Sequence, residues 1–261
     1  MFIDDSLMQT SAFWGIVVLS IASFIAGYID AIAGGAGLVL IPAFMLAGFT
    51  PQFALGQEKL VSTIGTFAAI KNFAKGGHIV LKVLPTGILA ALFGSYLGAK
   101  IILLLSAQMV SFIIMALLPF GLFIAIFKKL LKPRQSRQNT GLIASFITCF
   151  VVGFYDGFFG PGTGSLFIIA LSFLNGLSLL ESSGTSKILN LSSNIGAFIA
   201  FAMAGEMAFL LGIPMIISSV VANHIASLHA IKTDGALVQK VLYAVVLLML
   251  CTLVYQAIQG F

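Results

Sequence analysis

The stretch Gly27-Tyr-Ile-Asp30 occurs a second time as Gly153-Phe-Tyr-Asp156, at an offset of 126 residues. A glycine-rich stretch follows each copy: Gly34-Gly35-Ala36-Gly37 in the first and Gly160-Pro161-Gly162-Thr163-Gly164 in the second. Glycine lets the backbone leave the helical conformation at little steric cost. In each copy we therefore expect a hydrophobic helix that ends on an Asp and is interrupted over the glycines.

The two copies continue to match beyond the interruption, now at an offset of 128 residues. A duplicated pattern with interrupted hydrophobic segments is typical of transporters built from internal repeats. We predict a first transmembrane repeat at residues 1–131, a basic cytoplasmic linker at 132–139 and a second repeat at 140–261. The matched positions are Gly48 and Gly176, Gly56 and Gly184, Lys59 and Lys187, and Gly77 and Gly205.

The composition is that of a membrane protein. The chain is 60% hydrophobic and only 8% charged, and its mean hydropathy is +1.13, whereas a soluble domain carries roughly 25% charged residues. We therefore predict an all-α polytopic helical bundle in the lipid bilayer. The net charge of +5 does not indicate nucleic-acid binding, because basic residues in the loops of such a protein set its orientation. Cys149 and Cys251 lie in apolar segments without metal or redox spacing, and we predict neither a metal nor a cofactor.

Ten apolar segments can be drawn along the chain. The second and seventh are too short to cross the hydrocarbon as helices, which takes about 20 residues, but each adjoins a glycine-rich stretch that adds reach. The segments are expected at residues 12–29, 38–49, 54–73, 79–105, 107–127, 141–155, 166–174, 182–204, 207–229 and 236–255.

The distribution of charge predicts the orientation. Basic residues cluster after the fifth segment, after the third and after the ninth, so these loops are expected in the cytoplasm. The acidic N-terminus, the loop at Glu206 and the nearly uncharged C-terminus are then external, and each half crosses five times in inverted orientation. An eight-span alternative without the short segments would put Lys232 and Lys240 outside. The basic residues are Lys128, Lys129, Lys132, Arg134 and Arg137, then Lys71, Lys75 and Lys82, then Lys232 and Lys240, and the N-terminal acids are Asp4 and Asp5.

Two lysines begin polar stripes on otherwise apolar helices. Ser62, Thr63 and Thr66 follow Lys59 at i+3, i+4 and i+7, and Asn190 and Asn194 follow Lys187 at i+3 and i+7. Residues at these spacings share a helix face. A Lys near the bilayer centre costs roughly 3 kcal/mol, so it usually faces a polar cavity or a partner. The alternative is that the lysines snorkel from helix ends to the interface.

Two ammonium groups favour a small anion such as sulfite, a sulfonate or a carboxylate. The N–H groups of the helices that begin after Gly37 and Gly164 would add to the site. Close helix packing is the alternative explanation of the glycines. The predicted substrate-binding residues are Lys59, Ser62, Thr63, Thr66, Lys187, Asn190, Asn194, Gly34, Gly35, Gly37, Gly162 and Gly164.

Three acids belong to the same region. Asp30 and Asp156 could carry protons, pair with the lysines or cap the helix breaks. Glu58 could neutralise Lys59 or have a proton-linked role, and it has no acidic counterpart because Ser186 occupies the matching position. Protons are therefore a candidate coupling ion.

Enzymatic interpretations have less support. His224 and His229 are five residues apart and do not share a helix face well enough for a metal site. Ser165 follows glycines as in an intramembrane serine protease, but no recognisable His partner accompanies it.

The chain resembles the TauE/SafE family of bacterial sulfite exporters and sulfonate permeases. The resemblance lies in Gly27-Tyr-Ile-Asp-Ala-Ile-Ala-Gly-Gly-Ala-Gly37, Gly153-Phe-Tyr-Asp-Gly-Phe-Phe-Gly-Pro-Gly162, Lys59-Leu60, Lys187-Ile-Leu-Asn190 and Ser193-Asn194-Ile195-Gly196. It implies a secondary carrier of small sulfur-containing or organic anions, usually described as export. An Asn commonly precedes the first Lys in the family, whereas this chain has Glu58.

We therefore predict an inner-membrane carrier that moves a small anion by alternating access around a midplane site, alone or as an oligomer. An intramembrane enzyme or redox-relay protein and an anion channel are the alternatives.

Overall fold

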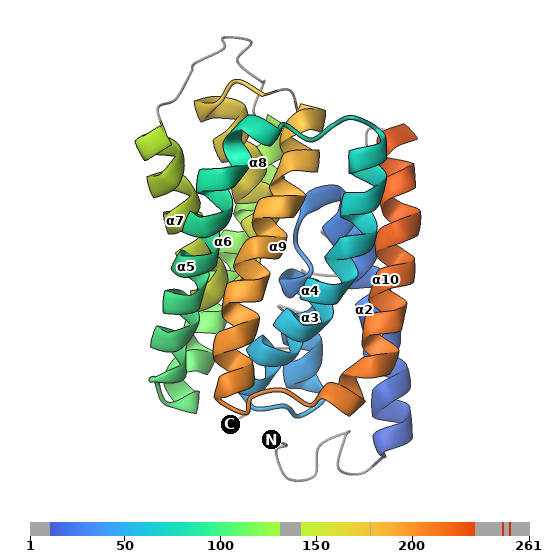
Figure 1. Cartoon of the computed structure of the whole chain (residues 1–261). Coiled ribbons are helices and arrows are strands. Elements are labelled where there is room, and N and C mark those ends of the chain that lie inside the picture. The colour runs from blue at the N-terminus through green and yellow to red at the C-terminus, as the bar shows by residue number, and fades with distance from the viewer. Residues whose placement is uncertain (1–10, 131–141, 178, 233–246, 248–250, 252–261) are drawn as a thin grey trace.

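The computed structural model describes residues 11–130, 142–177, 179–232, 247 and 251. Within these residues the chain is helical and contains no β-strand, and the helices stand side by side in one bundle (Figure 1). The α-helices are α2 (Ala12–Ala33), α3 (Gly37–Leu46), α4 (Pro51–Lys75), α5 (Leu84–Leu103), α6 (Ala107–Leu130), α7 (Leu142–Phe158), α8 (Thr163–Leu174), α9 (Leu179–Met203) and α10 (Phe209–Lys232), with a short 3-10 helix at Leu81–Val83.

These helices match the first nine predicted segments, with ends that differ by a few residues. The linker at 132–139, Lys240, the N-terminal acids and all of the tenth segment at 236–255 except residues 247 and 251 lie outside the described residues. Among the described residues, three stretches are long and apolar enough to cross a membrane, residues 12–32, 81–103 and 209–230. The prediction of a helical membrane protein is confirmed at this level.

Helices α4 and α9 have 25 residues each. They are more polar than the three apolar stretches because each of them carries one of the two lysines. Their polar side chains, among them Lys59 and Lys187, are buried against the rest of the bundle. Exposed apolar side chains lie on the outward faces of the helices, such as Phe112 of α6 and Leu210 of α10, and α4 and α9 contribute Phe67 and Met203. This is the distribution expected of a bundle whose outer solvent is lipid.

The interruptions differ from the prediction in one detail. Helix α2 does not end on Asp30 but continues to Ala33, and Gly34 then ends it with φ 70° and an N–H bond to the Asp30 carbonyl. A left-handed glycine in this position is a common helix terminator. Helix α7 likewise continues past Asp156 to Phe158. Both aspartates therefore lie in the last helical turn, where their side chains project sideways.

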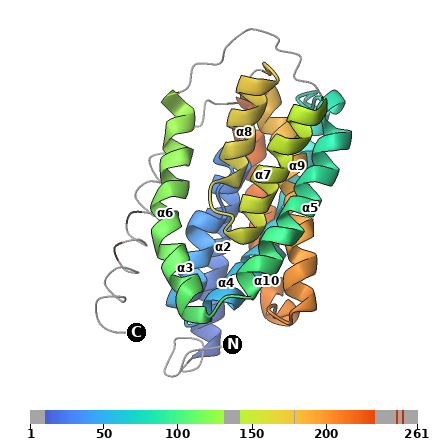
Figure 2. The same cartoon turned by 90° about the vertical axis from the view of Figure 1, so that its left-hand side faces the viewer.

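Helices α3 and α8 are short, with 10 and 12 residues, or about 15 and 18 Å. In Figures 1 and 2, α3 runs back from the interruption to the lower end of the bundle, where α2 began. Helix α8 runs back to the upper end, where α7 began. The two helical hairpins thus enter the bundle from opposite ends, and their tips meet inside it.

Several contacts between the two halves come in matching pairs. A residue of the first half contacts the second half, and the residue at the matching repeat position of the second half makes the same contact with the first half. The backbone of α5 at Ala91 packs on Gly153 of α7, and the backbone of α10 at Ser219 packs on Gly27 of α2. In each case a Cβ on the glycine would collide with a backbone carbonyl. Ala91 and Ser219 are themselves separated by the repeat offset of 128 residues.

The same exchange holds at the two ends of the bundle. Gly56 of α4 packs on the backbone of Glu206, and Gly184 of α9 packs on the backbone of His78. Beside them, Gln57 and Ala208 exchange two hydrogen bonds of 3.3 and 3.1 Å. The matching bond joins the Val80 N–H to the Thr185 hydroxyl at 3.0 Å. Gly27 and Gly153, and Gly56 and Gly184, are therefore contact points between the halves, whereas the matched pair Gly77 and Gly205 has open space around it.

Candidate functional site

The tips of the two helical hairpins touch each other. A Cβ built on Gly34 would lie 2.6 Å from the Cα of Gly164, so neither position has room for a side chain. This contact brings the beginnings of α3 and α8 together inside the bundle. The first N–H groups of a helix have no partner within that helix and carry its positive dipole end. The first N–H groups of α3 and those of α8 therefore lie beside the same small space.

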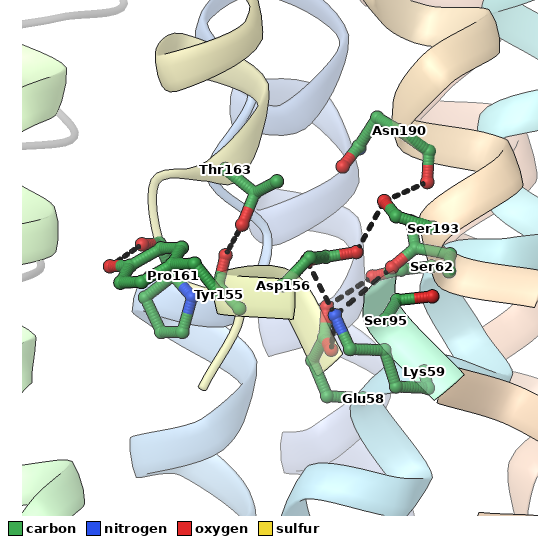
Figure 3. Close-up of polar contacts among 12 residues, drawn as sticks. Glu58, Lys59, Ser62, Ser95, Tyr155, Asp156, Pro161, Thr163, Asn190 and Ser193 are labelled. Atoms are coloured by element: carbon green, nitrogen blue, oxygen red, sulfur yellow. Dashed lines mark hydrogen bonds and ion pairs between the residues drawn. The ribbon is translucent and has the colours of Figure 1, made fainter. Parts of the chain in front are cut away.

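Lys59 of α4 forms an ion pair with the other half of the chain. Its ammonium group donates to Asp156 Oδ1 at 2.8 Å and to Asn194 Oδ1 at 3.0 Å, and it lies 3.3 Å from Glu58 Oε2 (Figure 3). The Lys59 side chain is only 2% exposed. A lysine so completely buried needs a partner of opposite charge.

Lys187 of α9 makes the reciprocal ion pair. Its ammonium group lies 3.5 Å from Asp30 Oδ2 and donates a hydrogen bond to the Asp30 backbone carbonyl. The lysine of each half is thus paired with the aspartate of the other half. Neither lysine snorkels to the membrane surface, because both are almost fully buried.

The side chains of the predicted polar stripes have different roles. Thr63 donates to the Lys59 carbonyl at 2.6 Å and Thr66 donates to the Ser62 carbonyl at 2.8 Å, so both bond mainly to their own helix. Ser62 donates to Glu58 Oε1 at 2.6 Å. Thr66 also lies 3.5 Å from Asp30 Oδ2.

A small polar cavity lies between the hairpin tips and helices α4 and α9. It has room for about one water molecule. Its wall contains most of the predicted site residues, but Lys59, Lys187, Thr63, Thr66 and Gly162 are not among the lining residues. The lining residues are Asp30, Gly34, Gly35, Ala36, Gly37, Glu58, Ser62, Asp156, Gly160, Thr163, Gly164, Asn190 and Asn194.

Lys59 nevertheless reaches this wall. A Cβ on Gly160 would lie 2.9 Å from the Lys59 ammonium nitrogen, so the ammonium group contacts the glycine break directly. Lys187 is bonded to Asp30, which is itself a lining residue. Both ammonium groups are therefore one contact away from the cavity.

The net charge of the site is not positive, although the two lysines alone suggested a positive site. Three carboxylates accompany the two ammonium groups: Glu58 and Asp156 pair with Lys59, and Asp30 pairs with Lys187. With all five groups ionised, the site carries a net charge of −1, from two positive and three negative groups. In this conformation each lysine is already neutralised, so an anion must compete with a carboxylate for it.

Sequence reasoning missed four residues of this region. Ser193 donates to Asp156 Oδ2 at 2.6 Å, although the matching position in the first half is Gly65. Ala36, Gly160 and Thr163 line the cavity. A signal for Gly160 was present, because it follows Asp156 by four residues as Gly34 follows Asp30.

The fold and this buried ion-pair network at two helix breaks define a class of protein, a helical membrane transporter. Residues 19–253 match the family described as Sulfite exporter TauE/SafE. The chain belongs to this family, which confirms the resemblance seen in the duplicated motif. The family is one of membrane transporters.

Several relatives align along almost their entire length. A protein of Sinorhizobium sp named "Probable membrane transporter protein ORF9" is 36% identical over 244 residues, which cover 91% of this chain and 92% of the relative. "Probable membrane transporter protein YfcA" of Escherichia coli K12 is 32% identical over 241 residues, which cover 92% and 90%. A probable membrane transporter protein of Haemophilus influenzae is 29% identical, with coverages of 92% and 94%. No solved structure matches significantly.

Proposed function

We propose that this protein is a secondary carrier of a small anion, of the sulfite or sulfonate type, that works by alternating access. The observation that carries the proposal is the convergence of Lys59 and Lys187 on one cavity from matching positions of the two halves. The anion would take the place of a carboxylate as the partner of a lysine.

The remaining groups of the cavity suit an oxyanion. Asn190, Asn194 and Ser62 have side chains that can donate hydrogen bonds, and all three line the cavity. The N–H groups at the beginnings of α3 and α8 add the positive ends of two helix dipoles. The cavity is too small for such an anion as it stands, so binding requires the hairpin tips to separate.

We propose further that the two halves, residues 1–131 and 140–261, are inverted repeats of five segments each. The support is that α2 and α7 begin at opposite ends of the bundle and that the contacts at Gly27 and Gly153 exchange partners. In this arrangement α4 and α10 end at the upper end of Figure 1, with Lys75 and Lys232. That end is assigned to the cytoplasm of a bacterial cell by its positive charge, and the lower end to the outside.

The exchanged contacts support alternating access. The bonds between Gln57 and Ala208 close the lower end, and the bond between Thr185 and Val80 closes the upper end. A rocking motion of one half against the other would break the hydrogen bonds at one end of the bundle and leave those at the other end intact. The crosswise ion pairs hold the moving parts in register.

Exchange in proteoliposomes tests this function. Vesicles that contain the protein and unlabelled sulfite should take up radiolabelled sulfite faster than vesicles without internal sulfite, and the uptake should saturate. Lys59→Met and Lys187→Met should abolish exchange, whereas Lys100→Met, which removes an exposed lysine next to Tyr96, should retain it. Uptake that rises linearly with concentration and ignores internal sulfite would indicate a channel instead.

A further inference from the structure

Glu58 breaks the symmetry of the site. Its counterpart in the second half is Ser186, so the network around Lys59 contains one carboxylate more than the network around Lys187. Glu58 is 3% exposed. Ser62 donates a hydrogen bond to Oε1, while Oε2 lies 3.3 Å from the Lys59 ammonium nitrogen and accepts no hydrogen bond.

Charged groups accompany Glu58 at the cavity on helices α4, α7, α2 and α9, whereas α3 and α8 carry none. Lys59 follows it on α4, and Asp156 of α7 shares the same ammonium group. Asp30 of α2 also lines the cavity and is paired with Lys187 of α9. Burial of a net charge is costly, so a further negative charge brought into this site favours the addition of a proton to one of its carboxylates.

The hydrogen bonds distinguish Glu58 from the other carboxylates. Asp156 accepts bonds from Lys59 at Oδ1 and from Ser193 at Oδ2, so each of its oxygens already has a donor. Asp30 is paired with Lys187 on α9. Glu58 alone has a buried oxygen that accepts no hydrogen bond, among the carboxylates that line the cavity.

We propose that Glu58 is the proton-binding group of the anion site, so that one proton is bound with each monovalent anion. This inference rests on the proposed function. The empty, fully ionised site has a charge of −1, and a monovalent anion at a lysine would make it −2. One proton on Glu58 Oε2 restores −1. Asp156, displaced from Lys59 by the anion, would keep its bond from Ser193.

Anion and proton therefore favour each other's binding and cross together. Linkage requires that each raises the affinity for the other by the same factor. An inward proton gradient should drive anion entry, and an outward gradient should drive exit. This chain has Glu58 at the position where an Asn commonly precedes the lysine. A variant with a neutral amide at position 58 should therefore lose the coupling.

The test is to count protons when an anion binds. Methanesulfonate is a suitable probe because it is a monovalent anion that does not itself exchange protons near neutral pH. Wild-type protein in weakly buffered detergent solution should take up about one proton per anion bound, measured with a pH-sensitive dye beside calorimetry. Glu58→Gln should bind the anion with almost no proton uptake, whereas Glu206→Gln, which changes an acid at the end of the bundle, should behave as wild type.

A second measurement covers the case of a poorly folded variant. In proteoliposomes, an inward proton gradient should accelerate methanesulfonate uptake by the wild type and leave uptake by Glu58→Gln unchanged. Equal proton uptake by the wild type and Glu58→Gln would overturn the assignment, and so would anion binding to the wild type without proton uptake. Failure of the wild type to bind any small anion would overturn the proposed function, and the coupling with it.

Discussion

Removal of Lys59 should destabilise the protein more than removal of its partner Asp156. Lys59→Met leaves two buried carboxylates, Asp156 and Glu58, without their common ammonium group. Asp156→Asn leaves Lys59 with Glu58 at 3.3 Å and Asn194 at 3.0 Å. The net charge of the site becomes −2 in the first variant and 0 in the second. The double variant returns to −1.

The size of the effect follows from these contacts. Removal of one partner of a buried ion pair costs about 3–5 kcal/mol, and 1 kcal/mol shifts the Tm of a chain of roughly this size by about 2–4 °C. Lys59→Met should therefore lower the Tm by about 6–20 °C. Asp156→Asn loses mainly charged hydrogen bonds, for which about 1.5–3 kcal/mol is typical, and should lower the Tm by about 3–12 °C. The double variant should be more stable than the sum of the two effects by about 1 kcal/mol or more.

The buried thiol of Cys149 provides the assay. A maleimide dye that fluoresces on reaction will report its exposure during heating, in a background in which the exposed Cys251 is replaced by Ser. Lys100→Met is the matched control and should leave the Tm unchanged within about 1 °C, since an exposed lysine contributes little. Strictly additive effects in the double variant would refute the ion pair. So would a Lys59→Met protein as stable as the wild type.

Two further predictions concern the packing and the orientation. Gly157→Ala should lower the Tm far more than Gly205→Ala, because a Cβ on Gly157 would collide with the Ser95 carbonyl. Gly205 has open space, and only its φ of 76° opposes a side chain, at a cost of about 1–2 kcal/mol. Equal shifts in thermal unfolding would contradict this packing of α5 on α7. In a cysteine-free background, Glu206→Cys should react with a membrane-impermeant maleimide in intact cells and Lys75→Cys should react only after lysis, and the reverse pattern would invert the proposed orientation.

The sequence predicted the helices and their interruptions because these depend on local properties. Hydrophobic runs, glycines and lysine positions are visible within one or two turns, and α3 and α8 lie where the short segments were expected. The last turn of α2 was missed because Gly34, and not Asp30, ends the helix. The predicted boundary followed the first polar residue, whereas the helix ends where the backbone turns left-handed.

The partners of the lysines could not be predicted from the sequence. Asp156 is 97 residues from Lys59, and nothing local shows that each aspartate reaches across to the other half. The lysines therefore looked like free positive charges, although three carboxylates accompany them. Thr63 lay on the predicted polar face, but its hydroxyl bonds to the Lys59 carbonyl, which is a common choice for Thr inside a helix.

Anion-dependent thermal stabilisation tests the central claim most directly. A ligand that binds only the folded state adds about 2.7 kcal/mol at one hundred times its Kd, which corresponds to a rise in Tm of about 5–11 °C. We expect sulfite or a small sulfonate to produce this rise in the wild type and in Lys100→Met, and to produce none in Lys59→Met or Lys187→Met, each compared with its own anion-free Tm. A rise that survives both substitutions would place the anion elsewhere and contradict the role of the crosswise lysines.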